Sequence, residues 1–267
     1  MLASVSQTPQ LDAEILLAHV LNQQRTYLRA HLDESLTPDQ AHKLYSLLQR
    51  RLQREPIAYL VGHKEFWSLD LEVNQDTLVP RPETELMVEM ALELFPDKAG
   101  RLHVADLGTG SGAIALALAS ERPLWEIDAV DISENALSVA RNNAQRLGLG
   151  RVSFYLGSWF TALPAGLFDM VLANPPYLSE DEWPAYAVSL ACEPRTALVS
   201  GLDGLDAIRI IIDGAREVIR PGGYLLIEHG MAQGANVRAL LVASGCHGVR
   251  TLLDLAGLER VSIGQFQ

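Results

Sequence analysis

The spacing of apolar and polar residues changes near residue 66 and divides the chain into two parts. Before that point apolar residues such as Leu11 and Ile15 recur every three or four positions, which predicts helices. Thr37 followed by Pro38 is typical of an N-cap and a first helical turn, so a further helix is expected to begin there. The first part is therefore predicted to be a small helical bundle.

Just after this part, apolar residues recur at every second position instead of every third or fourth. Leu69, Leu71 and Val73 alternate with polar residues, which is the pattern of a half-buried strand and favours one arm of a β-hairpin. We interpret the hairpin as the connection between a helical domain and a larger domain. The expected segments, in order, are residues 1–64, 65–79 and 80–267.

From residue 101 onward short apolar runs alternate with helical patterns, which predicts a doubly wound α/β sheet. The expected strands are 102–107, 125–131, 152–156, 168–173 and 223–228, and the expected helices are 113–121, 134–147 and 204–219. Two more strand-like runs, 246–253 and 258–266, are joined by a link too short for a parallel crossover. The fold class is thus α/β, with a mostly parallel sheet that ends in an antiparallel pair of strands.

A glycine-rich turn, Gly108-Thr109-Gly110-Ser111-Gly112, follows the first of these strands. Open α/β sheets bind ligands at the carboxyl ends of their strands, and glycine lets a ligand approach the backbone closely. Asp131 ends the next strand about 20 residues on, where an acidic residue binds ribose hydroxyls. These residues predict a nucleotide-type cofactor, and they fit a nicotinamide dinucleotide as well as S-adenosylmethionine.

The run Asn174-Pro175-Pro176-Tyr177, directly after the apolar strand 168–173, favours methyl transfer. An amide nitrogen is a poor nucleophile, so holding it in line with a sulfonium methyl group is most of the catalysis. The Asn174 oxygen and a proline carbonyl can each accept one N–H of an NH₂ group, while the prolines keep the backbone rigid. Tyr177 offers a flat wall or a hydroxyl. The motif therefore predicts S-adenosylmethionine-dependent methylation of a planar amide or amine nitrogen.

Composition limits the class of protein. The only cysteines, Cys192 and Cys246, form neither a CxxC pair nor a Cys/His cluster, so neither a disulfide framework nor a metal site is expected. The N-terminal residues lack the features of a signal peptide, and no apolar run approaches the roughly 20 residues that a bilayer requires. We expect a soluble, cytoplasmic protein that makes no contact with a membrane.

The net charge of −12 lies entirely in the second part of the chain. Residues 1–65 hold seven basic and seven acidic residues, whereas residues 66–267 hold 14 and 26. Because nucleic-acid affinity comes mainly from Lys and Arg neutralising phosphates, a DNA or RNA substrate is disfavoured. Arg50, Arg51 and Arg54 form one basic cluster, which we interpret as a solvated helix face.

The glycine-rich turn, Asp131 and the Asn174-to-Tyr177 motif, in this order and spacing, resemble class I S-adenosylmethionine methyltransferases that act on exocyclic or amide nitrogen. More specifically, the whole chain resembles the bacterial protein-glutamine N5-methyltransferases that modify peptide-chain release factors. The closer resemblance lies in Glu55-Pro56-Ile57-Ala58-Tyr59, Val79-Pro80-Arg81-Pro82-Glu83-Thr84-Glu85, Glu193-Pro194-Arg195-Thr196-Ala197-Leu198, Gly222-Gly223-Tyr224 and Glu228-His229-Gly230.

The resemblance implies a Rossmann-like methyltransferase sheet, S-adenosylmethionine as cofactor and S-adenosylhomocysteine as product. Residues 108–112 would pack around the methionine part of the cofactor, Asp131 would bind its ribose, and Trp159 would line the adenine pocket unless it is an ordinary core residue. Asn174, which would also contact the cofactor, and the Pro175 carbonyl would hold the glutamine amide, with Pro176 and Tyr177 beside it. The helical domain would present the Gly-Gly-Gln loop of a release factor to a monomeric enzyme.

Two other substrates are compatible with the sequence, namely a glutamine of a ribosomal protein and an exocyclic amine of DNA or RNA. A catalytically silent adaptor is a further alternative. His229 is expected to satisfy backbone groups rather than to act as a base. Glu193 and Arg195 are expected either to brace the active loop through an ion pair or to form a surface pair. Arg81 and Thr84 are expected either to approach the cofactor or to cap the following helix.

Overall fold

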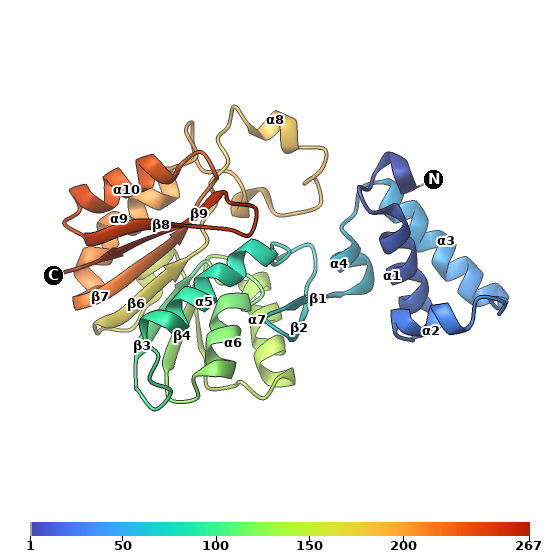
Figure 1. Cartoon of the computed structure of the whole chain (residues 1–267), viewed down its shortest axis with the longest axis horizontal. Helices are drawn as coiled ribbons and strands as arrows, with labels where there is room; N and C mark the ends of the chain where they lie inside the picture. The colour runs from blue at the N-terminus through green and yellow to red at the C-terminus, as the bar shows by residue number, and fades with distance from the viewer. Residues whose placement is uncertain (1) are drawn as a thin grey trace.

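The computed structural model describes residues 2–267, which form a helical part, a β-hairpin and a larger sheet part (Figure 1). The helical part consists of η1 (Leu2–Ser4), α1 (Pro9–Leu21), α2 (Arg25–Ala30), α3 (Pro38–Leu52) and α4 (Ile57–Val61). Helix α3 begins where the sequence predicts, because Thr37 and Gln40 form a capping box. The Thr37 hydroxyl accepts a hydrogen bond from the Gln40 backbone, and the Gln40 side chain accepts one from the Thr37 backbone.

The basic cluster at the end of α3 is only in part the solvated face that we expected, since the Arg50 side chain is 47% exposed. The side chain of Arg51 is only 14% exposed, and its Nε lies 2.8 Å from Oδ2 of the buried Asp12 on α1. Arg51 also donates to the carbonyls of Val5 and Glu55. The interpretation was wrong for Arg51 because spacing along one helix does not show which group meets a partner from another helix.

The sheet part contains seven strands in the order β5-β4-β3-β6-β7-β9-β8. Their bounds are β3 (His103–Leu107), β4 (Glu126–Asp131), β5 (Ser153–Leu156), β6 (Phe168–Ala173), β7 (Ile219–Glu228), β8 (His247–Leu253) and β9 (Glu259–Gln265). The first five of these strands pair in parallel, whereas β9 is antiparallel to both β7 and β8, which confirms the predicted fold. Strand β7 begins at Ile219 rather than at 223, because Ile219 already pairs with Phe168.

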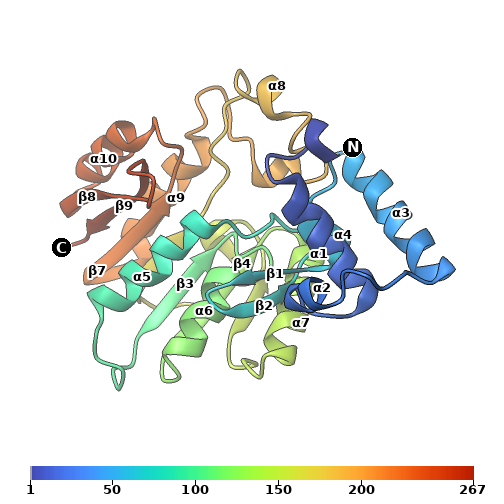
Figure 2. The same cartoon turned by 45° about the vertical axis from the view of Figure 1, so that its right-hand side comes forward.

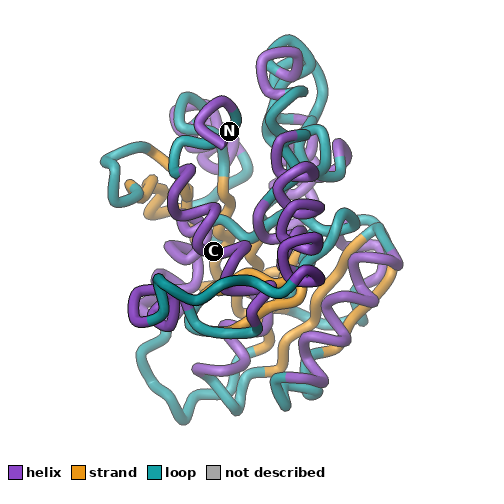
Figure 3. Tube along the Cα trace, turned by 90° about the vertical axis from the view of Figure 1, so that its right-hand side faces the viewer, coloured by secondary structure: helices purple, strands orange, loops and turns teal. Residues whose placement is uncertain are grey.

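Helices cover both faces of the sheet. Their bounds are η2 (Pro82–Thr84), α5 (Glu85–Leu94), α6 (Ala113–Glu121), α7 (Glu134–Arg146), η3 (Trp159–Ala162), α8 (Trp183–Tyr186), η4 (Arg195–Ala197), α9 (Asp206–Val218) and α10 (Gly234–Ala243). Side chains of α5, α6 and α7 join one buried cluster, and those of η3, α9 and α10 join the other. Figure 3 shows orange strands with purple helices on either side. Every helix within residues 2–267 is too short or too polar to cross a membrane.

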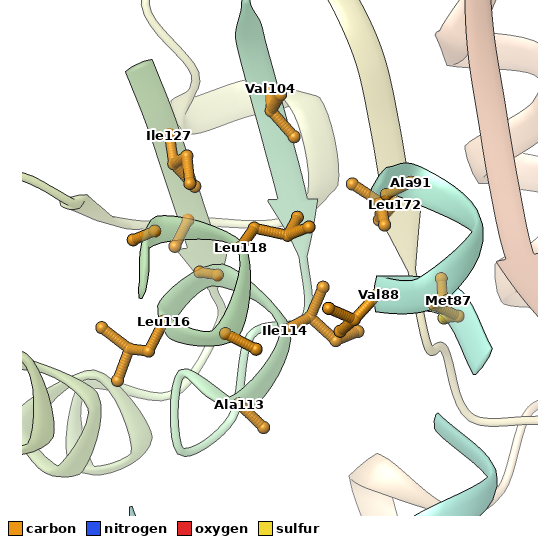
Figure 4. Close-up of a cluster of buried hydrophobic side chains, with 14 of the residues drawn as sticks. Met87, Val88, Ala91, Val104, Ala113, Ile114, Leu116, Leu118, Ile127 and Leu172 are labelled. Atoms are coloured by element: carbon orange, nitrogen blue, oxygen red, sulfur yellow. The ribbon is translucent and has the colours of Figure 1, made fainter. Parts of the chain in front are cut away.

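Strands β3, β4, β6 and β7 supply residues to both clusters, as expected from the two-residue period of a strand. Val104 of β3 belongs to the cluster under α5 and α6, whereas its neighbour Ala105 belongs to the cluster on the other face. In Figure 4 Val104, Ile127 and Leu172 extend from three strands toward these helices. The central strands β3, β4 and β6 are therefore buried on both sides, and their ends are what is available for chemistry.

The hairpin consists of β1 (His63–Phe66) and β2 (Leu69–Glu72), which pair antiparallel as the alternating pattern predicted. Phe66 and Leu71 are buried in the sheet part, and Asn143 of α7 hydrogen bonds to both backbone groups of Glu72. The hairpin is thus docked on the sheet part through its own core residues. The boundaries at 64 and 79 stay a prediction.

The strand order reverses beside β3, because β4 and β5 lie on one side of it and β6 and β7 on the other. In open α/β sheets the connections diverge at such a point and leave a crevice outside the carboxyl ends of the strands. The glycine-rich turn follows β3, and Asn174 follows β6. The topology therefore brings these two motifs to the same edge.

Candidate active site

A cavity of about 360 Å³ opens at this edge of the sheet, in the size range of small-molecule sites. It is lined by six of the residues that the sequence predicts, namely Gly108, Gly110, Asp131, Trp159, Asn174 and Pro176. The other predicted residues, Thr109, Ser111, Gly112, Pro175 and Tyr177, do not line it. Four segments that are distant in sequence therefore form one pocket, and the flanking residues of each motif support it from behind.

The glycines of the turn are required for two different structural reasons. Gly108 and Gly110 have φ of 75° and 57°, in the left-handed region that favours glycine. No atom lies within 4 Å of a Cβ placed on Gly110, so this backbone faces open space in the cavity wall. At Gly112, by contrast, a Cβ would lie 3.0 Å from Leu116 and 3.3 Å from Ala140. Gly112 is therefore required by the close packing of α6 and α7.

Thr109 and Ser111 hold the turn from the inside. The Thr109 hydroxyl donates to Oδ2 of Asp106 at 2.6 Å, and the backbone N–H of Ala115 donates to the same oxygen. The Ser111 carbonyl accepts a hydrogen bond from Asn143. Burial raises the pKa of Asp106 to about 6, although the two hydrogen bonds act in the opposite direction. These residues fix the shape of the turn without lining the cavity.

Asp131 ends β4 with its carboxylate at the cavity. Oδ2 accepts a hydrogen bond from the Gly110 backbone at 2.8 Å, and Oδ1 accepts one from the Ser133 backbone at 2.9 Å. Burial raises the pKa of Asp131 above its ordinary value, and these bonds oppose the rise. The backbone of Ile132 bonds to the same carboxylate. The group is therefore held rigidly and keeps a lone pair that can accept a bond from a ligand hydroxyl.

Trp159 is not only a core residue, because it also lines the cavity, and its role toward adenine stays a prediction. Its ring lines the cavity and also packs against the buried cluster on that face of the sheet. Its φ is 49°, which a bulky residue adopts only when its surroundings require it. The next residue, Phe160, is in close contact with Gly214 of α9, which has no room for a Cβ. Packing of η3 on α9 thus sets the position of the indole.

Asn174 is oriented by a chain of buried hydrogen bonds. Its Nδ2 donates to Oγ1 of Thr84 at 3.1 Å, and the Thr84 hydroxyl donates to Oε2 of Glu228 at 2.7 Å. Thr84 occupies the N-cap position of α5 but makes no side-chain capping bond, and it does not line the cavity. The expected capping bond was therefore wrong, whereas an approach of Thr84 to the cofactor stays a prediction. Within residues 2–267 Oδ1 of Asn174 accepts no hydrogen bond, which leaves this oxygen as an acceptor for a ligand.

Comparison with known proteins identifies the family. Two family models match the chain, the PrmC N-terminal domain at residues 1–62 and a methyltransferase domain at residues 98–247. The release factor glutamine methyltransferase of Salmonella typhimurium is 48% identical over 98% of this chain and 94% of its own length. That of Coxiella burnetii is 46% identical over 99% and 94%. The chain belongs to the release factor glutamine methyltransferase family.

This membership confirms the resemblance drawn from the sequence motifs and makes the chain a methyltransferase. A methyltransferase structure from Pyrococcus furiosus has a TM-score of 0.57 to this chain, at 18% identity, and the match covers 81% of this chain and 98% of that one. At that identity the likeness concerns the fold alone. It agrees with the strand order seen here.

Glu228 is the last residue of β7. It joins the site through its hydrogen bond to Thr84, although the sequence motifs assigned it no role. It is 1% exposed, and burial raises its pKa to about 7. The Thr84 hydrogen bond and the charges of Arg260 and Arg81 oppose this rise, whereas Glu83 adds to it. A carboxylate that directly follows an apolar strand is the sequence signal that could have identified it.

Tyr177 is half-buried behind the cavity. Its backbone carbonyl accepts a hydrogen bond from Gln233 at 2.9 Å, and its backbone N–H donates to Leu198. Burial and the nearby charge of Glu228 raise the pKa of the Tyr177 phenol, so the group stays neutral. The structure therefore places Tyr177 as a neutral, anchored ring at the end of the motif.

The segment between β6 and α9 forms a loop that returns to the cavity. Leu178 pairs with Val199 at the base of the loop, and Pro194, Thr196 and Ala197 line the cavity wall. We had expected Glu193 and Arg195 to form a pair, and this was wrong. Glu193 instead accepts hydrogen bonds from Arg81 and the Val79 backbone, and Arg195 pairs with Glu180.

Residues 75–78, which follow the hairpin, also line the cavity, and the sequence analysis missed them. Their polar, irregular sequence is typical of a connection and carries no signal for a binding wall. Glu193 ties this connection to the active loop, because it bonds to Val79 and Arg81 just beyond it. The two outer walls of the cavity are thus clamped together by one buried carboxylate.

His229 satisfies neighbouring polar groups, as we expected. Nδ1 lies 2.9 Å from the Gly230 carbonyl, and Nε2 lies 2.9 Å from the Ser262 hydroxyl. Burial lowers the pKa of His229, so the ring is neutral. Within residues 2–267 no group of three His, Cys, Asp or Glu side chains is placed to hold a metal ion.

Proposed function

We propose that this protein transfers a methyl group from S-adenosylmethionine to the side-chain amide nitrogen, N5, of the glutamine in the Gly-Gly-Gln loop of peptide chain release factors. The hydrogen-bond chain from Glu228 through Thr84 to Asn174 carries the proposal. It occupies the amide nitrogen of Asn174 and leaves the amide oxygen as an acceptor. A substrate NH₂ group has two donors and therefore needs acceptors of this kind.

The cavity supports S-adenosylmethionine as the cofactor. Gly108 and Gly110 offer exposed backbone for the methionine part, Asp131 offers a carboxylate for the ribose, and Trp159 offers a ring face for the adenine. Asn174 lines the same cavity, so it would contact the cofactor as well as the substrate. The bound cofactor supplies an activated methyl group on sulfur, and the protein supplies binding and orientation.

The residues of the motif would then position the nitrogen. Asn174 Oδ1 and the Pro175 carbonyl each accept one N–H, which fixes the amide nitrogen and favours the pyramidal geometry that develops as the N–C bond forms. The buried Pro175 and its neighbour Pro176 keep that carbonyl from turning away. As the N–C bond forms and the S–C bond of the cofactor breaks, the nitrogen would release one proton to water.

The helical part is suited to present a protein substrate to this site. Tyr59 of α4 donates its hydroxyl to the carbonyl of Thr77, a residue of the cavity wall. Figure 2 shows the N-terminal helices beside the loop that carries α8. Burial raises the pKa of the Cys192 thiol in this loop, and the connection between α3 and α4 lies close enough for the charge of Glu55 to add to the rise. We infer that a release factor docks against both, and that the enzyme acts as a cytoplasmic monomer.

A methylation assay tests the proposal. The protein is incubated with labelled S-adenosylmethionine and a release factor, or the same factor with the Gly-Gly-Gln glutamine replaced by alanine, and mass spectrometry locates the added mass of about 14 Da. Label should appear only on the intact factor. Label that persists on the alanine variant, or that appears instead on a ribosomal protein or an RNA, would overturn the assignment.

The variant Asn174→Ala links the reaction to the motif. Methylation should be abolished while cofactor affinity, measured by calorimetry, falls only about two- to threefold, because Gly110, Asp131 and Trp159 retain most of the cavity surface. Asn142→Ala on the exposed face of α7 is the matched control and should leave activity intact. Full activity in Asn174→Ala would contradict the proposed role of the motif.

A further inference from the structure

The hydroxyl of Thr84 occupies a position at which the direction of a single proton matters. Thr84 is 4% exposed and Glu228 is 1% exposed, so water does not replace either partner. The Thr84 oxygen lies 2.7 Å from the Glu228 carboxylate and 3.1 Å from the Asn174 amide nitrogen. A hydroxyl has one proton to donate and two lone pairs to accept with. The group that receives this proton decides what Thr84 can offer to Asn174.

An ionised carboxylate can only accept hydrogen bonds. When Glu228 is ionised, Thr84 must donate to it, and its remaining capacity toward Asn174 is to accept. The Asn174 amide then turns its nitrogen to Thr84 and its oxygen away. When Glu228 is protonated, it can donate to Thr84, and the Thr84 proton becomes available to the Asn174 oxygen. The amide would then present NH₂ toward the substrate NH₂, and two donors would face each other.

We propose that Thr84 and Glu228 are positioning residues for methyl transfer: the Glu228 carboxylate directs the Thr84 hydroxyl, which holds the Asn174 amide with its oxygen toward the substrate nitrogen. This inference rests on the proposed function, since it deepens the account of the same site. Neither residue touches the reacting atoms. The Asn174 amide has two orientations that are similar in shape but exchange the positions of its donor and its acceptor. Thr84 and Glu228 both act by selecting one of them.

The residues around Glu228 make the hydrogen-bond chain from Glu228 to Asn174 depend on pH. Arg260 on β9 and Arg81 before η2 act on it with positive charge, Glu83 on η2 acts on it with negative charge, and the neutral phenol of Tyr177 lies near it. Burial outweighs the two arginines and raises the pKa of Glu228 to about 7. The productive orientation of the amide should therefore be lost as pH falls below about 7.

Three variants test the inference. Thr84→Val keeps the shape and removes the hydroxyl, so kcat should fall on the order of 30-fold. The KM for the release factor and the affinity for cofactor should change less than about twofold. Thr84→Ser restores the hydroxyl and should recover most of the loss. Glu228→Gln should keep partial activity and lose the decline of kcat below about pH 7, because glutamine accepts from Thr84 without titrating.

Matched controls are available elsewhere in the sheet. Thr251→Val removes a threonine hydroxyl that bonds to Ser262 and Arg238, and Glu259→Gln neutralises a carboxylate that pairs with Arg238. Both should leave kcat and its pH dependence as in the parent protein. Wild-type kcat in Thr84→Val, failure of serine to rescue, or an unchanged acid decline in Glu228→Gln would overturn the inference.

A measurement without substrate separates this inference from the proposed function. The side-chain NH₂ resonances of Asn174, assigned by their loss in Asn174→Ala, should shift with a midpoint near pH 7 and should not titrate in Glu228→Gln. If the chemical shifts of these resonances did not change with pH in the parent protein, the inference would be overturned even if release factors are methylated. A parent protein that titrates as expected but methylates no release factor would support the inference and overturn the proposed function.

Discussion

The clamp formed by Glu193 leads to a quantitative prediction for Glu193→Ala. The Glu193 side chain is 2% exposed, and it accepts hydrogen bonds from the Val79 backbone at 3.0 Å and from the Arg81 guanidinium. Val79 is itself 6% exposed, so water cannot readily replace the lost acceptor. The substitution therefore leaves one buried donor and one partly buried cation without their partner.

The size of the effect follows from these two losses. A buried backbone donor left without an acceptor costs about 1–3 kcal/mol. Arg81 is 36% exposed, so water recovers much of its interaction and its share is about 1 kcal/mol. The total of roughly 3 kcal/mol acts on the packing of the loop 178–199 against residues 75–81. Since only part of the cavity wall depends on that packing, we expect cofactor affinity to fall by roughly 2 kcal/mol, which is about 20-fold to 30-fold in Kd.

Isothermal titration calorimetry with S-adenosylhomocysteine measures this directly, and hydrogen exchange of residues 190–198 reports the packing of the loop. Glu180→Gln is the matched control, because Glu180 lies on the same loop and pairs with Arg195 while both are about half exposed. It should change Kd less than about twofold. If Glu193→Ala bound the cofactor as tightly as the parent and its loop exchanged no faster, the clamp would have no part in forming the cavity.

Three further predictions concern stability. Burial raises the pKa of Glu228 from 4.5 to about 7, so the folded state binds its proton more tightly than the unfolded state and loses stability as pH rises through this range. Denaturation at pH 5 and pH 8 should show that the free energy of unfolding of Glu228→Gln, relative to that of the parent, rises by roughly 3 kcal/mol between the two pH values. An equal difference between variant and parent at both pH values would refute this. Gly112→Ala combines a φ of 86° with a contact to Leu116 at 3.0 Å and should lower the free energy of unfolding by about 2–3 kcal/mol, with a matching drop in Tm. Asp12→Asn leaves the buried Arg51 without its counter-charge, and should cost about 2–4 kcal/mol in a urea titration, whereas a solvated pair would cost less than about 1.

Much of the fold could be predicted because its signals are local. The apolar run 168–173 and the helical pattern 113–121 match β6 and α6 residue for residue, and the capping box at Thr37 starts α3 where expected. Side-chain period and capping chemistry act over a few residues, so they can be seen without knowing the partners of a segment. The same holds for the glycine-rich turn and for Asn174, whose residue types are dictated by backbone conformation and by the atom to be held.

What the tertiary structure decided are the contacts between segments that are distant along the chain. Asn174 and Thr84 are 90 residues apart, Thr84 and Glu228 are 144 apart, and Glu193 and Val79 are 114 apart. A threonine or a buried carboxylate can serve many purposes, and only its neighbours in space select one. The sequence by itself predicted that Asn174 would hold a planar nitrogen. The packing of three distant segments determined which atom of the Asn174 amide is bonded to the protein, because the direction of a hydrogen bond depends on partners that local sequence does not contain.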